Sequence, residues 1–271
     1  MTRIALIGGG RIGEALIAGL LDAGRAAKDL VIAEAVPERA AELEETFGVR
    51  VTTVADAAEG ADIIVVAVKP ADVDAVINDL AAVDVDAENE QLIVTMAAGI
   101  ATGRYEPKLP AGFPVVRVMP NTPMLVGEGM SALAPGRYAK EAHLEQVREM
   151  LSAVGKVVTV TEAQMDAVTA VSGSGPAYFF LVAEAMIEAA VGLGITHRNA
   201  KDLVVQTMVG SAAMLERSGD SPAELRAAVT SPAGTTAAAV RKLEQNGLRS
   251  AFIEALTAAK NRSEAQGAAN E

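Results

Sequence analysis

The chain has 271 residues and is acidic, with 23 Lys and Arg against 35 Asp and Glu, which gives a net charge of −12. This balance, without a cluster of Lys and Arg, argues against nucleic acid or an anionic membrane surface as a partner. The hydrophobic share of 51% is enough for the cores of one large or two ordinary domains. The lack of Cys excludes a disulfide framework, a thiolate nucleophile and a Cys-based zinc site.

The first ten residues, MTRIALIGGG, hold one Arg and a short apolar stretch. This stretch is too short and wrongly flanked for a signal peptide, so we expect a cytoplasmic protein.

The first 160 residues alternate short β-branched runs with helical patterns, which predicts a parallel α/β sheet covered on both faces. Helices are expected to begin near Arg11, Pro37, Ala71 and Lys140. Strands are expected at residues 3–7, 30–33, 49–51, 62–68, 91–95, 115–119, 130–133 and 156–160.

The strand patterns stop near Thr161, and the rest of the chain is Ala-rich with helical periodicity. Segments rich in Gly, Pro and Ser interrupt it at residues 172–176, 192–196, 218–222 and 230–234. The sequence therefore predicts a dinucleotide-binding domain over residues 1–162 and an all-helical domain over residues 163–271.

The predicted helix 177–191 is apolar nearly all round, interrupted only by Glu184 and Glu188. It is shorter than the roughly 20 residues that span a bilayer, so we do not expect a membrane segment. A helix that is hydrophobic on every side needs more covering than one small helical domain supplies. We therefore expect this helix to be buried in the interface of a homodimer.

The first predicted strand leads into Gly8-Gly9-Gly10-Arg11-Ile12-Gly13, a GxGxxG pattern followed by an apolar-faced helix. Gly8 permits a tight turn, Gly10 lets the backbone approach a pyrophosphate, and Gly13 lets the helix lie close to the strand. The free N–H groups of the first helical turn attract phosphates. This context predicts dinucleotide binding, against the alternative of a simple Gly-rich turn.

Glu34 and Arg39, which both follow the second predicted strand, favour different cofactors. Glu34 lies 21 residues after Gly13, where an acidic side chain hydrogen-bonds the ribose hydroxyls and repels a 2′-phosphate, which favours NADH. Arg39 begins the next helix and is suited to pair with a 2′-phosphate, which favours NADPH. An ordinary exposed pair of charges is the third interpretation, and the choice between NADPH and NADH stays open.

Two loops display hydroxyls and backbone donors before a helix. Residues 172–176 precede the apolar helix, with Pro176 where its missing N–H costs nothing. Residues 230–236 precede a predicted helix over 237–245. Each suits a carboxylate, although each is also explained as an ordinary helix cap. Together with a dinucleotide site they predict a small anionic substrate.

The available chemistry is limited by missing residue types. His143 lies in a helical surface pattern and His197 in a predicted N-terminal turn, so neither is a convincing general base of the kind that alcohol oxidation needs. Reduction of a cyclic imine that arrives protonated needs only a positioned hydrogen-bonding group such as a Thr hydroxyl. Glu184 and Glu188 have no His companion, so no metal site is predicted.

Four motifs closely resemble those of the pyrroline-5-carboxylate reductase family: AVKP at 67–70, RVMPNTP at 117–123, AVSGSGPAYFF at 170–180 and VTSPAGTT at 229–236. The resemblance covers the whole chain. It implies reduction of L-1-pyrroline-5-carboxylate to L-proline, the last step of proline biosynthesis, by NADPH or NADH. It also implies a Rossmann domain followed by a helical dimerisation domain, with dimers often assembled into a decamer of five dimers.

The resemblance also assigns residues. Thr236 is expected to be the catalytic residue, hydrogen-bonded to the ring nitrogen. The substrate-binding residues are expected to be Ser231, Gly234, Thr235, Thr236 and Ser172. The cofactor-binding residues are expected to be Ile7, Gly8, Gly9, Gly10, Arg11, Ile12, Gly13, Glu34, Arg39, Ala67, Val68, Lys69, Pro70, Met96, Ala97, Ala98 and Asn121.

This sequence departs from the family pattern at three positions. Ala233 stands where the family usually has Gly, so the loop is strained if that position needs a positive φ. Glu34 stands where members that prefer NADPH often have Ser, Asn or Arg, and Val54 where some have an Asn that touches the adenosine end. The last two departures weaken an assignment to NADPH.

Two other functions remain as alternatives. A related nicotinamide oxidoreductase would act on a hydroxy acid or another cyclic imine, but such enzymes normally carry a Lys on the first helix of the C-terminal domain, and the helix after SGSGP has none. A non-catalytic dinucleotide sensor or scaffold would bind the cofactor without turnover, and would leave Ser231 and Thr236 unexplained.

Overall fold

The computed structural model describes residues 2–83 and 91–269. The chain forms two compact units, residues 1–174 together with 259–271, and residues 175–258, which we describe separately. These units differ from the predicted domains in that residues 163–174 and the end of the last helix group with the sheet.

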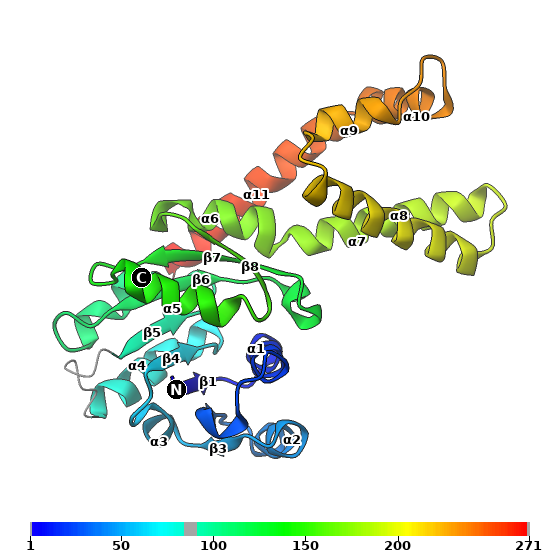
Figure 1. The fold of residues 1–271 in the computed structure, drawn as a ribbon. Coiled ribbons are helices and arrows are strands. Elements are labelled where there is room, and N and C mark those ends of the chain that lie inside the picture. The colour runs from blue at the N-terminus through cyan, green and yellow to red at the C-terminus, as the bar shows by residue number, and fades with distance from the viewer. Residues whose placement is uncertain (1, 84–90, 270–271) are drawn as a thin grey trace. The chain divides into compact units, whose positions relative to one another are not determined.

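The first unit is built on an eight-stranded sheet in the order β3-β2-β1-β4-β5-β6-β7-β8 (Figure 1). Its registers place Ile7 at the end of β1 opposite Ala33 on β2 and Val66 on β4. The segments that follow these three strands therefore meet at one edge. The strands are β1 (Ile4–Ile7), β2 (Leu30–Ala33), β3 (Arg50–Thr52), β4 (Ile63–Val66), β5 (Leu92–Thr95), β6 (Val115–Met119), β7 (Gly129–Pro135) and β8 (Gly155–Thr159).

All eight predicted strands are present, but the predicted parallel direction is wrong for the last two. β7 pairs antiparallel with β6, with Val118 opposite Leu133, and β8 is parallel to β7. The connection from β6 to β7 is one 3₁₀ segment, η6 (Thr122–Val126), ended by Gly127 at φ 74°. Such a connection is too short for the crossover that a parallel pair needs, so the chain turns back.

Helices cover both faces of the sheet, as the sequence predicts. On one face Ile4 and Leu6 pack in the same cluster as Leu16 of α1, and on the other Ala5 and Ile7 pack with Ile77 of α4. This alternation along β1 is the two-residue period of a strand buried on both sides. The first face carries α1 (Arg11–Asp22), α2 (Pro37–Phe47) and α5 (Glu141–Leu151), and the second α3 (Val54–Ala58) and α4 (Val73–Ala82).

Short helical segments fill the connections of this unit, and the sequence pattern does not predict them. The helix expected near Ala71 begins as one of them and continues as α4. They are η1 (Ala27–Asp29), η2 (Pro70–Asp72), η4 (Thr102–Arg104), η5 (Glu106–Lys108), η7 (Glu162–Gln164), α6 (Met165–Val168) and the π-type segment η8 (Thr169–Gly173).

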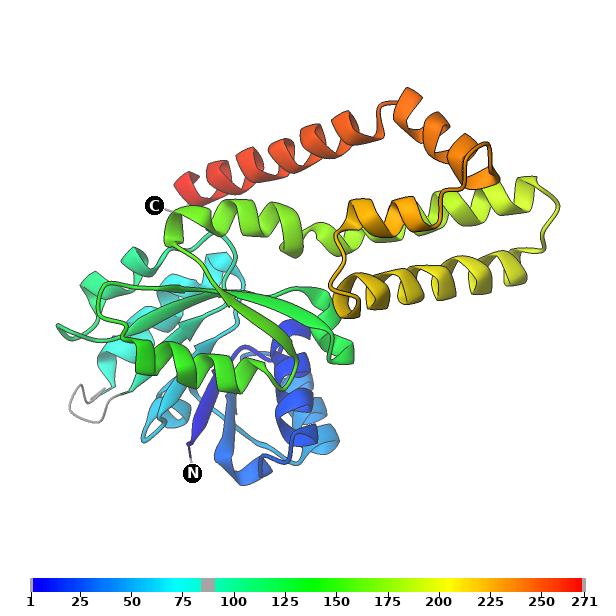
Figure 2. The same cartoon turned by 45° about the horizontal axis from the view of Figure 1, so that its top comes forward.

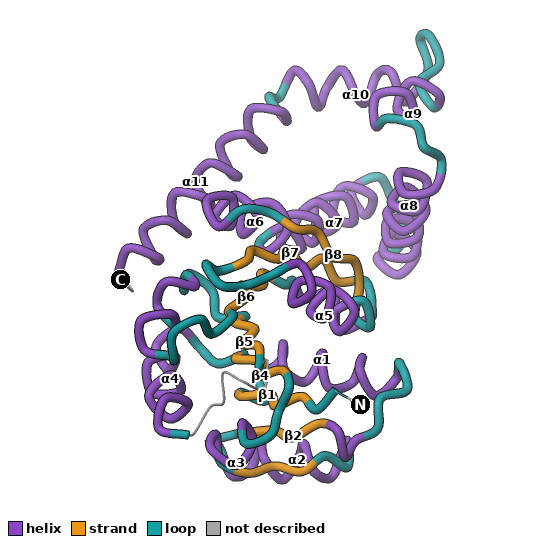
Figure 3. The backbone as a smooth tube through the Cα atoms, turned by 60° about the vertical axis from the view of Figure 1, so that its left-hand side comes forward, coloured by secondary structure: helices purple, strands orange, loops and turns teal. Residues whose placement is uncertain are grey.

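The second unit consists of helices and loops in the described residues (Figure 3). α7 and α8 lie side by side as an antiparallel pair (Figure 2). The Thr196 hydroxyl caps α8 by accepting from the Asn199 N–H, and Ser221 with Glu224 forms a capping box on α9. The helices are α7 (Gly175–Gly192), α8 (His197–Arg217), α9 (Pro222–Ala228), α10 (Thr235–Gln245) and α11 (Leu248–Ala269), of which residues 248–258 belong to this unit.

The helical unit of a single chain has almost no core. Gly175, Ala200 and Val204 are the buried residues of α7 and α8, and none is buried in α9 or α10. Large apolar side chains are exposed instead, among them Phe180 at 68% and Leu193 at 84%. Exposed apolar area of this extent marks an interaction surface.

The helical run that contains α7 is longer than predicted. It extends over residues 162–192, and by length and composition alone it is long and apolar enough to cross a membrane. The sequence pattern predicted a helix of about 15 residues, because Gly and Pro at 172–176 were interpreted as a helix start.

Candidate functional site

The glycine loop between β1 and α1 has a backbone shape that only Gly fits at two positions. Gly8 has φ +102°, and a Cβ there would lie 2.8 Å from the Ala67 carbonyl oxygen. A Cβ on Gly13 would lie 2.2 Å from the Gly8 carbonyl oxygen. At Gly10, by contrast, nothing lies within 4 Å, so the backbone is open on that side to a bound group.

The helix that follows leaves backbone donors for a phosphate. Gly10 is the N-cap of α1 and supplies no side-chain cap, so the first N–H groups of the helix have no intrahelical partner. A diphosphate fits this combination of an open glycine and a helix N-terminus. The residues present therefore fit the dinucleotide that the sequence predicts.

A cleft of about 780 Å³ opens at this edge of the sheet. It brings together eight of the residues predicted to bind a cofactor: Ile7, Gly8, Gly10, Glu34, Arg39, Ala67, Val68 and Lys69. The sequence interpretation did not assign cofactor roles to ten further lining residues: Ala33, Ala35, Val36, Thr52, Thr53, Val54, Asp72, Ala75, Val76 and Asp79. Most of these follow β2, β3 or β4, and the shared strand edge is the signal that points to them.

The rim of the cleft after β2 is a network of charged groups around Gly9. Glu34 accepts the Gly9 N–H at 2.8 Å and the Val36 N–H at 2.9 Å. Arg39 donates from Nε to the Gly9 carbonyl at 2.8 Å, from Nη1 to Glu42 at 3.0 Å and from Nη2 to Glu14 at 2.5 Å. The hydrogen bond to Glu42 is the largest cause raising the pKa of Arg39 above its ordinary value.

Several other predicted cofactor residues do not line this cleft. Met96 and Ala97 directly follow β5 and are buried, and the Met96 N–H donates to the Val66 carbonyl at 2.8 Å. Gly9, Arg11, Ile12, Gly13, Pro70, Met96, Ala97, Ala98 and Asn121 are the predicted residues outside the lining. Their contact with a cofactor stays a prediction.

Asn121 joins two segments that are far apart in sequence. Its Nδ2 donates to the Ser172 carbonyl at 3.0 Å, and its Oδ1 accepts the Met130 N–H at 2.8 Å. Both ends of the amide are thus used by backbone groups, so Asn121 positions the turn that carries Ser172.

The predicted free helix N-terminus at residues 172–176 is wrong. The helical run continues through η8 into α7, and the Ser174 N–H donates to the Thr169 carbonyl at 2.8 Å. The Ser172 hydroxyl donates to the Val168 carbonyl at 3.1 Å. A π-type segment inserts one extra residue into the helix, which local sequence pattern does not reveal. A substrate role for Ser172 stays a prediction.

The loop at residues 230–236 does precede a helix, as predicted. α10 begins at Thr235 with Gly234 as N-cap and no side-chain cap, and the Gly234 N–H donates to the Ser231 carbonyl at 3.0 Å. In the described part of the chain the hydroxyls of Ser231, Thr235 and Thr236 have no hydrogen-bond partner, and Thr236 is half-buried. The loop thus offers free hydroxyls and backbone donors in one place.

Ala233 in this loop has a left-handed backbone with φ 59°, as expected from the Gly that usually stands there.

We expect Ala233→Gly to raise the free energy of unfolding by up to about 1 kcal/mol. An L residue in the left-handed backbone region costs about 1–2 kcal/mol, and Gly does not have this cost. Urea denaturation of both proteins measures the change. Ala238→Gly inside α10 is the matched control and should lower stability by about 0.5–1 kcal/mol. Equal losses in the two variants would contradict the strained backbone.

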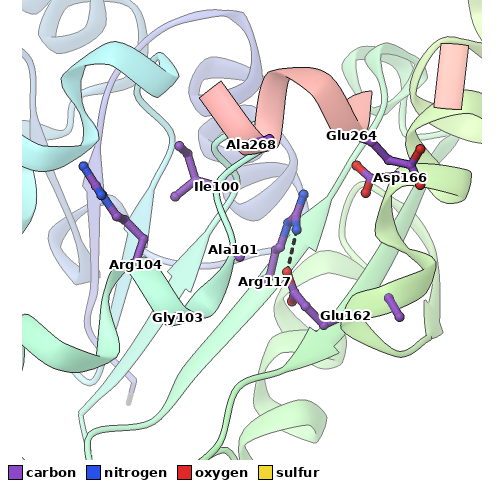
Figure 4. Close-up of a pocket in the computed structure, with 12 residues that line it drawn as sticks. Ile100, Ala101, Gly103, Arg104, Arg117, Glu162, Asp166, Glu264 and Ala268 are labelled. Atoms are coloured by element: carbon purple, nitrogen blue, oxygen red, sulfur yellow. Dashed lines mark hydrogen bonds and ion pairs between the residues drawn. The ribbon is translucent and has the colours of Figure 1, made fainter. Parts of the chain in front are cut away.

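A second pocket of about 730 Å³ lies in the first unit between the loop after β5, the start of α6 and the end of α11 (Figure 4). Arg117, with 7% of its side chain exposed, pairs there with Glu162 at 2.5 Å. Ser263 donates to Asp166 at 2.6 Å, and Arg104 pairs with Asp74. Glu264 pairs with Lys260 at 2.5 Å, so the charged side chains of this pocket have partners within the protein, and the second oxygen of Glu162 is buried without a hydrogen bond to the described residues.

The histidines lie where the sequence predicts. His143 is in the first turn of α5, where its Nδ1 accepts the Lys140 N–H at 3.0 Å, and His197 is exposed at the start of α8. Neither lines the cleft.

Two family models match the chain. Residues 162–266 match pyrroline-5-carboxylate reductase dimerisation, and residues 3–99 match NADP oxidoreductase, coenzyme F420-dependent. The pyrroline-5-carboxylate reductase of Mycobacterium tuberculosis is 56% identical over 97% of this chain and 96% of its own length. That of Corynebacterium melassecola is 47% identical over 98% of this chain and 99% of its own.

Solved structures agree with these relatives. A pyrroline-5-carboxylate reductase from Coxiella burnetii has a TM-score of 0.92 and 36% identity, covering 98% of both chains. The Plasmodium falciparum pyrroline carboxylate reductase with NADP bound has a TM-score of 0.85 and 29% identity, covering 98% of both chains. This chain belongs to the pyrroline-5-carboxylate reductase family of NAD(P)-dependent oxidoreductases.

Proposed function

We propose that this protein reduces the C=N bond of L-1-pyrroline-5-carboxylate to give L-proline. The observation that carries the proposal is the presence, in one chain, of a dinucleotide cleft and of the free hydroxyls of the TSPAGTT loop. NADPH or NADH supplies the hydride when bound.

The carboxylate of the substrate is held by the loop before α10. The Ser231 hydroxyl, the uncapped N–H groups of Thr235 and Thr236, and the positive end of the α10 dipole all favour an anion. The carboxylate is what distinguishes this substrate from a simple cyclic imine.

Thr236 positions the ring nitrogen. Its hydroxyl accepts the N–H of the protonated imine, and after hydride addition at the neighbouring carbon the nitrogen is a neutral amine that takes a proton from water. Because the substrate arrives protonated, no general base is needed, and none of the lining residues of the cleft is a histidine. This chemistry suits the residues that are present better than alcohol oxidation does.

We also propose that the exposed apolar surface of α7 is covered by a second copy of this chain. Glu184 and Glu188 lie in the middle of the apolar helix, and two carboxylates are costly in lipid. A homodimer, with further assembly into a decamer of five dimers as the family resemblance implies, therefore fits better than a membrane. The cytoplasm is the compartment that we propose, with a small-molecule substrate and no nucleic-acid partner.

The test is oxidation of NADH and NADPH by the purified protein in the presence of 1-pyrroline-5-carboxylate, with proline identified by chromatography. 1-Pyrroline, which lacks the carboxylate, is the matched control and should turn over far more slowly. Cofactor binding without turnover would support the sensor alternative. Equal turnover of both imines would contradict the carboxylate role of the loop.

A further inference from the structure

The rim of the cofactor cleft after β2 carries more negative than positive charge. Glu14 and Glu42 pair with the guanidinium of Arg39, and Glu34 accepts the N–H of Gly9, the residue whose carbonyl Arg39 contacts. Glu34 and Arg39 both line the cleft, and both are held by the same residue of the glycine loop. Their orientations are therefore linked to the loop that receives the pyrophosphate.

The protein uses three of the five N–H donors of Arg39. Its Nε, Nη1 and Nη2 donate to a backbone carbonyl and to two carboxylates, Glu42 and Glu14. A guanidinium recognises phosphate through the same donors in a planar fork. A 2′-phosphate would find only two of the five N–H donors unused and would compete for the guanidinium with the carboxylates of Glu14 and Glu42.

Glu34 is also held by the protein, but in a way that leaves it able to bind a ribose hydroxyl. Its two carboxylate oxygens each accept one backbone N–H, from Gly9 and from Val36. Each oxygen keeps a further lone pair, so the carboxylate can still accept a ribose hydroxyl. A 2′-phosphate has no such donor when ionised and carries a charge of the same sign.

The lack of a side chain at Gly9 lets Glu34 lie against the glycine loop. A Cβ on Gly9 would lie 2.3 Å from Leu43 Cδ1 and 3.1 Å from Glu34 Oε2. A larger residue would push Glu34 and α2 away from the loop. The second glycine of the GGG run therefore permits the close approach of the carboxylate, a role separate from phosphate binding.

Lys69 is the other cation of the cleft and comes from the segment after β4. In the sheet β1 lies between β2 and β4, so the ends of the two strands that lead to Glu34 and to Lys69 are two strand spacings, about 10 Å, apart. Lys69 thus reaches the cleft from a different strand end than Glu34.

We propose that Glu34 makes this protein select NADH over NADPH, and that Glu14 and Glu42 withhold Arg39 from the 2′-phosphate. The inference rests on the cofactor cleft and not on imine reduction. It assigns a specificity role to the ion pairs and hydrogen bonds that hold Arg39 and Glu34 against the glycine loop.

Isothermal titration calorimetry with NADH and NADPH, without an imine, tests the proposal. The wild-type protein should bind NADH at least about tenfold more tightly than NADPH. Glu34→Gln keeps an acceptor for one of the two N–H groups but removes the charge, and should tighten NADPH binding about tenfold while NADH, which loses a charged acceptor for its ribose hydroxyl, binds more weakly. Glu42→Gln releases one donor of Arg39 and should tighten NADPH binding severalfold, with little change for NADH.

Glu38→Gln is the matched control, because Glu38 is an exposed carboxylate on α2 that makes no hydrogen bond or ion pair with the described residues. It should change neither affinity. NADH binding in every variant reports an intact fold. Tighter binding of NADPH than of NADH by the wild type, or an unchanged NADPH affinity in Glu34→Gln, would overturn the proposal. Failure of imine turnover would leave these affinities unaffected and would concern only the proposed reaction.

Discussion

Replacing Thr236 by Ala is expected to lower kcat/KM for imine reduction roughly tenfold to a thousandfold. The Thr236 hydroxyl is half-buried at the start of α10 and has no hydrogen-bond partner in the described part of the chain. In the reaction proposed above, its loss removes one positioned hydrogen bond to the reacting nitrogen, while the cofactor cleft is untouched. Steady-state kinetics with NADH and with NADPH, at saturating cofactor, measures the effect.

Thr236→Ser is the control, because it keeps the hydroxyl and should restore most of the activity. Calorimetric titration of Thr236→Ala should give dinucleotide affinities close to those of the wild type, since the residue belongs to the helical unit and the cleft to the sheet unit. If Thr236→Ala turned over as fast as the wild type, the assigned role would be refuted.

The second large effect is expected on assembly. Phe180 lies on α7 with 68% of its surface exposed in the single chain. If a second copy buries it, each Phe contributes about 2–3 kcal/mol to association, and a symmetric dimer contains it twice. Phe180→Glu should therefore raise the dimer dissociation constant by at least about a thousandfold, because a buried carboxylate adds its own desolvation cost.

Sedimentation velocity over a dilution series measures this change. Ala142→Glu, on the exposed side of α5, introduces the same charge outside the helical unit and should leave assembly unchanged. The wild-type series also separates a dimer from a decamer of five dimers. An unchanged dissociation constant for Phe180→Glu would exclude α7 from the interface.

Much of the sheet could be predicted because its information is local. β2 and β6 have the predicted bounds, since β-branched runs between turn residues form buried strands wherever the chain supplies a partner. The left-handed backbone at Ala233 was also predictable, from a motif whose usual residue is Gly. Strand direction was not, since a period of two is the same in a parallel and in an antiparallel strand.

One part of the candidate site could likewise be predicted from the sequence and another part could not. The glycine loop and its helix were predictable, because spacing and residue type specify a turn that only Gly can adopt. α7 does begin at Gly175, within the predicted stretch, but its start is not free as predicted, because the π-type segment Thr169–Gly173 leads directly into it.

By itself the sequence determined the strands and the main helices, their order, the dinucleotide loop and the family motifs, all of which depend on residues close together along the chain. The tertiary structure decided which charges meet. Glu14 and Arg39 are 25 residues apart, and Arg117 and Glu162 are 45 apart, yet each pair forms an ion pair. Whether Arg39 is free for a phosphate or held by two carboxylates depends on how α1 and α2 pack against one loop, and no local pattern encodes that packing.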